Sequence, residues 1–185
     1  MSFVLVGQNS RPGDLWRWAP GYNMIKLLEI LREQNKIQIA SPATDSEIND
    51  LENKLSIKLP SQYILLLKYS NGLQFNSELF DKILSANEVG LYKDLSSESH
   101  SIWTQEEFTV SDDEYSIYGE KQDPVYFRPQ YLHNSVQISN EFDAAVILLN
   151  PNIIFPDNWE VIVVASWYPG AARYKSLIEF FETLW

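Results

Sequence analysis

The sequence predicts an α+β fold in which N-terminal helices and a C-terminal helix pack on a mainly antiparallel β-sheet. Apolar residues recur at helical spacing within residues 23–70 and again within 176–185. Between these regions, short apolar runs are broken by Asn, Asp, Gly and Pro, which is typical of antiparallel strands joined by turns. The 185 residues, 45% of them hydrophobic, suit one domain that buries a sizeable core.

Two helices are expected in the first third of the chain. The first spans residues 23–34, with Asn23 as its N-cap and leucines on one face. The second begins after Pro42, where Thr44 and Glu47 have the spacing of a capping box. In such a box the hydroxyl and the carboxylate each accept a hydrogen bond from a free backbone N–H, so the helix start is well defined.

Two further helices are marked by their ends. One is expected from Leu59-Pro60, because proline fits a first helical position, to Asn71-Gly72, where both residues tolerate a left-handed backbone. The last helix follows Ser176, and Glu179 repeats the capping-box spacing. Its apolar face must be covered by another element, for which the sheet is the expected platform.

The central strands of the sheet are expected at residues 144–149 and 161–165, which are nearly continuous apolar runs. Asn150-Pro151 is expected to end the first of them. Weaker signals predict strands at 115–118 and 136–139 and a short helix at 85–92.

The chain is acidic, with 25 Asp and Glu against 14 Lys and Arg and a net charge of −11. This charge argues against nucleic acid and anionic membranes as ligands and favours a basic partner, although it is also explained by solubility alone. The acidic segment, residues 96–123, holds eight acidic residues and one lysine, and so −7 of the net charge. With Trp103 and Phe108 interleaved, it is interpreted either as a solvated loop or as an acidic, aromatic-bearing partner surface.

The sequence contains few residues or motifs that could support catalysis or metal binding. There is no cysteine, and only His100 and His133 are present, without the spacing of a metal pair on one helix. No nucleophile elbow, phosphate loop or dinucleotide fingerprint occurs, so no catalytic, cofactor-binding or metal-binding residue is expected. A hydrolase using paired carboxylates stays open as an alternative. The absence of a signal peptide and of a long apolar run predicts a cytoplasmic protein.

Two segments carry a family resemblance. The first is an acidic amphipathic helix followed by Leu59-Pro60, Tyr63, a leucine-rich helix and Asn71-Gly72. The second is the series Leu148-Leu149-Asn150-Pro151, Trp159-Glu160, Trp167, Pro169-Gly170-Ala171 and Arg173-Tyr174. Together they resemble the SUKH superfamily over roughly residues 44–185. The chain departs from many relatives at Asp157-Asn158, where they carry Gly-Glu; this alters the turn and should keep the strand.

The resemblance implies one SUKH-like domain over residues 1–185, with 44–185 as the family-like core and 1–43 as an N-terminal extension that includes one helix. It also implies a non-enzymatic protein-binding module. Many bacterial members resemble immunity proteins that neutralise a cognate toxin, often a nuclease, and the family also includes fungal cell-wall synthesis regulators that act as interaction hubs. A general scaffold with several partners is therefore the alternative function.

The partner surface is expected to be acidic and aromatic. Trp159 and Trp167 are expected in the core or a cleft wall, because large apolar groups are usually buried. Arg173 is expected to pair with a carboxylate, cap a carbonyl or contact the partner. The candidate partner-binding residues are Trp103, Glu106, Glu107, Asp112, Asp113, Glu114 and Arg173.

Overall fold

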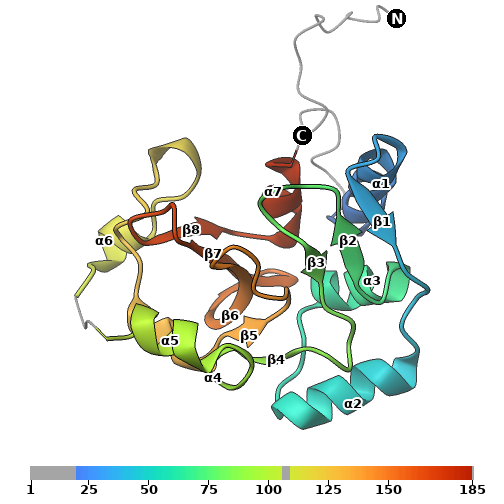
Figure 1. Cartoon of the computed structure of the whole chain (residues 1–185), viewed down its shortest axis with the longest axis horizontal. Coiled ribbons are helices and arrows are strands. Elements are labelled where there is room, and N and C mark those ends of the chain that lie inside the picture. Colours follow the sequence, from blue (N-terminus) through green and yellow to red (C-terminus); the bar gives the residue numbers. More distant parts are fainter. Residues whose placement is uncertain (1–19, 106–108, 185) are drawn as a thin grey trace, which may run out of the picture.

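The computed structural model describes residues 20–105 and 109–184 and confirms the α+β class. A five-stranded antiparallel sheet lies between two groups of helices (Figure 1). Its strands follow one another in the order β4 (Gly90–Leu91), β5 (Val136–Gln137), β6 (Ala145–Phe155), β7 (Asn158–Ala165) and β8 (Ala171–Tyr174). No helix in the described part of the chain is long and apolar enough to cross a membrane.

A second antiparallel sheet was not predicted. It contains β1 (Ile37–Ile39), β2 (Leu73–Phe75) and β3 (Lys82–Ile83), in that order. Strands of two or three residues are too short to show an alternating pattern in the sequence. An antiparallel bridge between Ile83 and Ser139 joins this sheet to the residues that follow β5.

The larger core lies on one face of the five-stranded sheet. Odd-numbered residues of β7, such as Val161 and Val163, point into it, because side chains alternate between the faces of a strand. This core is covered by α1 (Pro20–Glu33), α2 (Asp45–Leu55), α3 (Ser61–Tyr69) and α7 (Leu177–Glu182). Although α1 and β1 fall in the expected extension, Leu28 and Ile37 are fully buried in the same core.

The predicted helix ends need three corrections. The first helix begins at Pro20 rather than Asn23, since proline fits the first turn. Pro60 is the N-cap of α3 rather than its first residue. At the end of α3, only Gly72 has a left-handed backbone, with φ 89°. A Cβ there would lie 2.9 Å from the carbonyl oxygen of Ile83, so glycine is also required by close packing.

The capping box of α2 is confirmed. The Glu47 backbone N–H donates to Thr44 Oγ1 at 3.2 Å, and the Thr44 N–H donates to the Glu47 carboxylate at 2.7 Å. At α7 only half of the predicted box forms. Ser176 accepts the Glu179 N–H, but the Glu179 carboxylate accepts the N–H of Lys175 instead.

The two central strands are confirmed, but Asn150-Pro151 does not end the first. Strand β6 continues to Phe155, with an irregular register between Asn150 and Ile154 that accommodates the proline. The chain then turns through Asp157, at φ 65°, and β7 begins at Asn158. The departure from the family pattern at these two residues therefore keeps the strand, as expected.

The other face of the sheet is covered by residues 92–105 and 109–134. They form α4 (Tyr92–Leu95), α5 (Ser97–Trp103), α6 (Asp112–Tyr115), η2 (Gly119–Lys121) and η3 (Pro129–Asn134). Two weak predictions are wrong here: residues 115–118 form no strand, and the helix expected at 85–92 begins only at Tyr92. The strand expected at 136–139 is confirmed in its first half. Even-numbered residues of β7, such as Ile162 and Val164, pack beneath this layer in a second apolar cluster.

Candidate protein-binding surface

Three polar residues from neighbouring strands meet on the second face of the sheet. Asn150 on β6 lies directly opposite Glu160 on β7, and Arg173 on β8 lies opposite Ile162, two residues further along. The period of two places all three side chains on one face. Each is no more than 1% exposed, so a charged pair is buried between apolar residues.

The carboxylate of Glu160 is fully hydrogen-bonded. One oxygen accepts from the Tyr115 hydroxyl at 2.7 Å and the Asn150 amide at 2.6 Å. The other accepts from the Tyr118 hydroxyl at 2.8 Å and from Arg173 Nη1 at 3.3 Å. These four hydrogen-bond donors offset the free-energy cost of removing the carboxylate from water. Without them, a buried charge at this position would be very unfavourable.

Arg173 extends this network into the acidic segment. Its guanidinium donates to the carbonyl oxygens of Tyr115 at 2.6 Å and Ile117 at 3.2 Å. It also lies 4.0 Å from the centre of the Tyr115 ring. The assignment of Arg173 to the partner surface must therefore be corrected, because its side chain pairs with a carboxylate and caps carbonyls inside the protein.

The two tyrosines act as hydrogen-bond donors to Glu160. Burial, followed by the nearby charge of Glu160, raises the pKa of Tyr115 and of Tyr118 far above the usual range, so both hydroxyls keep their protons and donate to Glu160. We call the five residues Tyr115, Tyr118, Asn150, Glu160 and Arg173 the polar anchor. This network was not predicted from the sequence, although one signal is present there: Glu160 interrupts an otherwise apolar run.

A second contact holds the acidic segment along the edge of the sheet. The side-chain amide of Gln122 donates to the Arg173 carbonyl at 2.7 Å and accepts the Arg173 N–H at 2.7 Å. The Ala171 N–H donates to the Pro124 carbonyl at 2.9 Å. Residues 122–124 thus pair with β8 much as another strand would, which covers an edge that could otherwise pair with a second chain.

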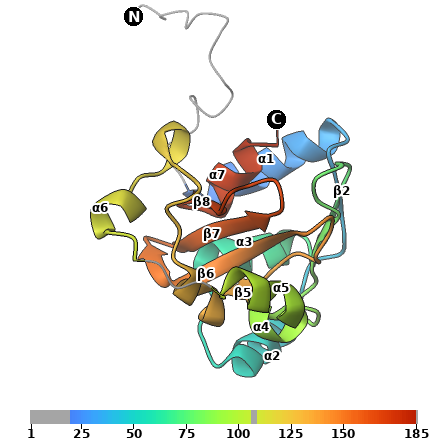
Figure 2. The same ribbon diagram turned by 60° about the vertical axis from the view of Figure 1, so that its left-hand side comes forward.

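Most acidic residues in the described part of this segment are exposed. Figure 2 shows α6 on the flank of the sheet, far from α1. Asp113 and Glu120 are exposed, and Asp112 is exposed although it pairs with Arg128 at 2.5 Å. The Glu114 carboxylate instead completes a capping box with Ser111. The carboxylates of residues 112–114 therefore differ in their availability to a partner.

The other candidate partner-binding residues and the two family tryptophans differ in exposure. Trp103 is half-buried, and its ring meets that of Phe127 edge-on, with ring centres 6.1 Å apart. Glu106 and Glu107 lie outside the described residues. Of the two other tryptophans considered, Trp159 is buried in the core as expected, whereas Trp167 is 39% exposed.

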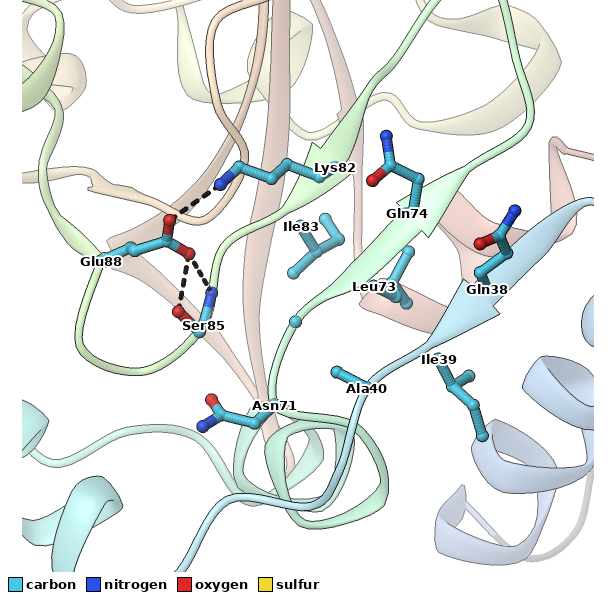
Figure 3. A pocket seen from close by; sticks show the side chains of 11 residues that line it. Gln38, Ile39, Ala40, Asn71, Leu73, Gln74, Lys82, Ile83, Ser85 and Glu88 are labelled. Carbon is cyan, nitrogen blue, oxygen red and sulfur yellow. Dashed lines mark hydrogen bonds and ion pairs between the residues drawn. The ribbon is translucent and has the colours of Figure 1, made fainter.

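A pocket of about 340 Å³ lies elsewhere, on the three-stranded sheet (Figure 3). Its charged groups are already paired, because Lys82 contacts Glu88 at 2.8 Å and Ser85 donates to the same carboxylate. These bonds, that from Lys82 first, lower the pKa of Glu88 to about 2. Asn71 likewise donates to Glu47 and accepts the Ala86 N–H. The pocket is thus lined by groups that stabilise one another.

The two histidines lie side by side. His133 Nδ1 is 3.1 Å from His100 Nε2, although the residues come from η3 and α5. Burial, and then the nearby His133, lowers the pKa of His100. Over residues 20–105 and 109–184, no group of three or more His, Cys, Asp or Glu side chains is placed to hold a metal ion.

The fold and the surface define an α+β protein that carries an acidic segment fixed to its sheet by buried polar residues. The model of the SMI1 / KNR4 family (SUKH-1) matches residues 42–183, and the chain belongs to this family. The resemblance to the SUKH superfamily is thereby confirmed. No curated protein matches the sequence.

The motif residues of this family have structural roles in the chain. Gly72 allows β2 to approach β3, and Asn71 ties α2 to the turn at Ala86. Asn150, Glu160 and Arg173 form the part of the polar anchor that lies on the sheet.

Proposed function

We propose that the protein acts by binding another protein rather than by catalysis, and that it is an immunity protein whose partner is a basic toxin domain. The observation that carries the proposal is the anchored acidic segment, which holds −7 of the net charge of −11. Membership of the SUKH-1 family supports the immunity role, which the resemblance implied for many bacterial members.

The physical basis is electrostatic complementarity. A nuclease or another toxin that acts on an anionic substrate needs a basic surface, and an acidic inhibitor is attracted by the same field. The polar anchor fixes the backbone that carries Asp113 and Glu120, so less conformational entropy is lost when a partner binds.

Calorimetry tests the proposal directly. The titrant is the C-terminal domain of the protein encoded by the gene adjacent to that of this chain, at a low and a near-physiological salt concentration. We expect tight one-to-one binding that weakens as salt rises, because screening reduces the attraction between opposite fields. Absence of binding by the folded chain would contradict the proposal.

A charge-reversed pair shows whether the acidic segment provides the attraction. The variant Asp113→Lys/Glu120→Lys changes two exposed carboxylates that lie outside the polar anchor. The variant Asp50→Lys/Glu78→Lys makes the same change in net charge at two exposed positions on α2 and the β2–β3 loop. We expect about tenfold weaker binding at low salt for the first pair only. Equal losses for both pairs would assign the effect to net charge alone.

A further inference from the structure

We infer that one end of the five-stranded sheet forms the centre of the partner interface, and that it accepts an apolar side chain projecting from a basic protein surface. This inference rests on the proposed function and deepens it. We call this surface the apolar end. It is built by α5 and by residues 123–127, 140–144 and 166–170.

The strand register brings two of these segments together. Phe142 forms an antiparallel bridge with Ala145, and Ala145 lies opposite Ala165. Residues 140–144 therefore precede β6 at the same end of the sheet at which residues 166–170 follow β7. Asn150 and Glu160 of the polar anchor lie five residues away along these strands, which is about 17 Å along the sheet.

Side-chain and backbone contacts add the other two segments. The hydrogen bond from Ala171 to the Pro124 carbonyl sets residues 123–127 beside the start of β8. The Ser99 hydroxyl donates to the Glu141 carboxylate, which joins α5 to the segment that contains Phe142. Ile102 follows Ser99 by three residues and so lies on the same side of α5.

The apolar end concentrates exposed apolar side chains. Nine large hydrophobic residues are exposed in the described part of the chain, and five of them lie here. Their exposed fractions are 60% for Ile102, 44% for Val125, 36% for Tyr126, 39% for Phe142 and 39% for Trp167. Exposed apolar residues gathered in this way mark interaction sites, and Trp and Tyr are enriched among the residues that dominate binding energy.

The charged residues in these segments indicate that the partner surface is basic. The four segments contain Glu98, Asp123, Glu141 and Asp143 and no lysine or arginine. All four carboxylates belong to exposed residues. An apolar centre with a rim of one charge is complementary to an apolar side chain surrounded by Lys and Arg, since the rim steers the encounter and the centre supplies affinity.

The backbone beneath Phe142 is held in an unfavourable conformation. Asp143 and Ala144 have φ values of 48° and 57°, and Phe142 and Ala145 exchange backbone hydrogen bonds of 3.0 Å and 2.8 Å across this two-residue turn. An alanine is disfavoured in the left-handed region, because its Cβ approaches the backbone too closely. Such strain is concentrated at functional sites, and here the strained turn lies directly after the exposed Phe142.

A matched pair of variants tests the inference by calorimetry against the same toxin domain. Phe142→Ala/Trp167→Ala removes two side chains of the apolar end. Leu79→Ala/Ile154→Ala removes two exposed apolar side chains elsewhere, which are 51% and 71% exposed. We expect about 100-fold weaker binding for the first pair and less than about threefold for the second. Ile102→Ser, on α5, is the second probe if the first variant unfolds, and its expected loss is about tenfold.

The outcomes separate the two proposals. If the wild-type chain does not bind, the proposed function fails and this inference fails with it. If the wild-type chain binds and all folded variants of the apolar end bind equally well, only the inference is overturned. The variant Glu141→Gln/Asp143→Asn is expected to reduce the salt dependence of binding, and an unchanged dependence would contradict the charged rim.

Discussion

The carboxylate of Glu160 and the guanidinium of Arg173 meet at 3.3 Å between two strands, and neither side chain is exposed to solvent. Both groups also bind the acidic segment, Glu160 through the hydroxyls of Tyr115 and Tyr118 and Arg173 through two carbonyls. A buried ion pair thus connects the sheet to the segment that carries most of the negative charge.

Loss of this pair should destabilise the fold. We expect Arg173→Met to lower the free energy of unfolding by about 3–5 kcal/mol, because it leaves the charge of Glu160 buried without its partner. Urea unfolding followed by circular dichroism measures the change. Lys121→Met, at an exposed residue of η2, is the control and should change stability by less than about 0.5 kcal/mol. Similar values for the two variants would contradict the role of the pair.

The start of α2 provides a second test. Thr44→Ala removes the hydroxyl that accepts the Glu47 N–H, and we expect a loss of about 1 kcal/mol in the free energy of unfolding. Ser46→Ala changes a similar exposed residue within the first turn and should be nearly neutral. The capping role would be wrong if thermal or urea unfolding showed no difference between the two.

The strained turn after Phe142 predicts a gain in stability. Ala144→Gly removes the steric penalty at φ 57° and makes the unfolded chain more flexible, so the net gain should be about 0.5–1 kcal/mol. Ala172→Gly, within β8, is expected to lose about 0.5–1 kcal/mol. A destabilised Ala144→Gly variant would show that the turn is not under strain.

The histidine pair predicts a pH dependence. His100 is partly buried beside His133, with Lys93 and Asp94 also near, and its pKa in the folded protein lies below the 6.5 of the unfolded chain. The unfolded state therefore binds more protons as pH falls through 6.5, and stability is lost from there towards the folded pKa. Glu88 loses its contribution only below its unfolded pKa of 4.5, so the two windows are separate.

His100→Gln should remove this part of the pH dependence. We expect the free energy of unfolding of the wild-type protein to fall between about pH 7 and pH 5, and that of the variant to fall less over the same range. Urea unfolding at several pH values measures both. Parallel curves for the two proteins would contradict a lowered pKa at His100.

Local rules explain which parts of the fold could be predicted. The Thr44–Glu47 capping box depends on residues three apart, so its signal is contained in the sequence. The runs that become β6 and β7 are apolar on both sides because both faces of the sheet are covered. The prediction that the strand ends at Asn150-Pro151 was wrong, because Pro151 occupies an irregular part of β6 where a missing N–H is tolerated.

The site was harder to predict because it depends on contacts between distant residues. The acidic residues of 112–114 looked equivalent in the sequence, yet Asp112 pairs with Arg128 and Glu114 caps a helix. The burial of Arg173 follows from Glu160 and from Tyr115, which is 58 residues away along the chain. The apolar end likewise forms only when the sheet register brings the segments of Phe142 and Trp167 to the same end of the sheet.

Growth of cells that produce the toxin domain of the adjacent gene is the most direct test of the central claim. Production of the toxin domain alone should stop growth, and coproduction of this chain should restore it. The variant Phe142→Ala/Trp167→Ala should restore growth less well than Leu79→Ala/Ile154→Ala at equal protein levels. Arrested growth despite a folded, abundant wild-type chain would contradict the account.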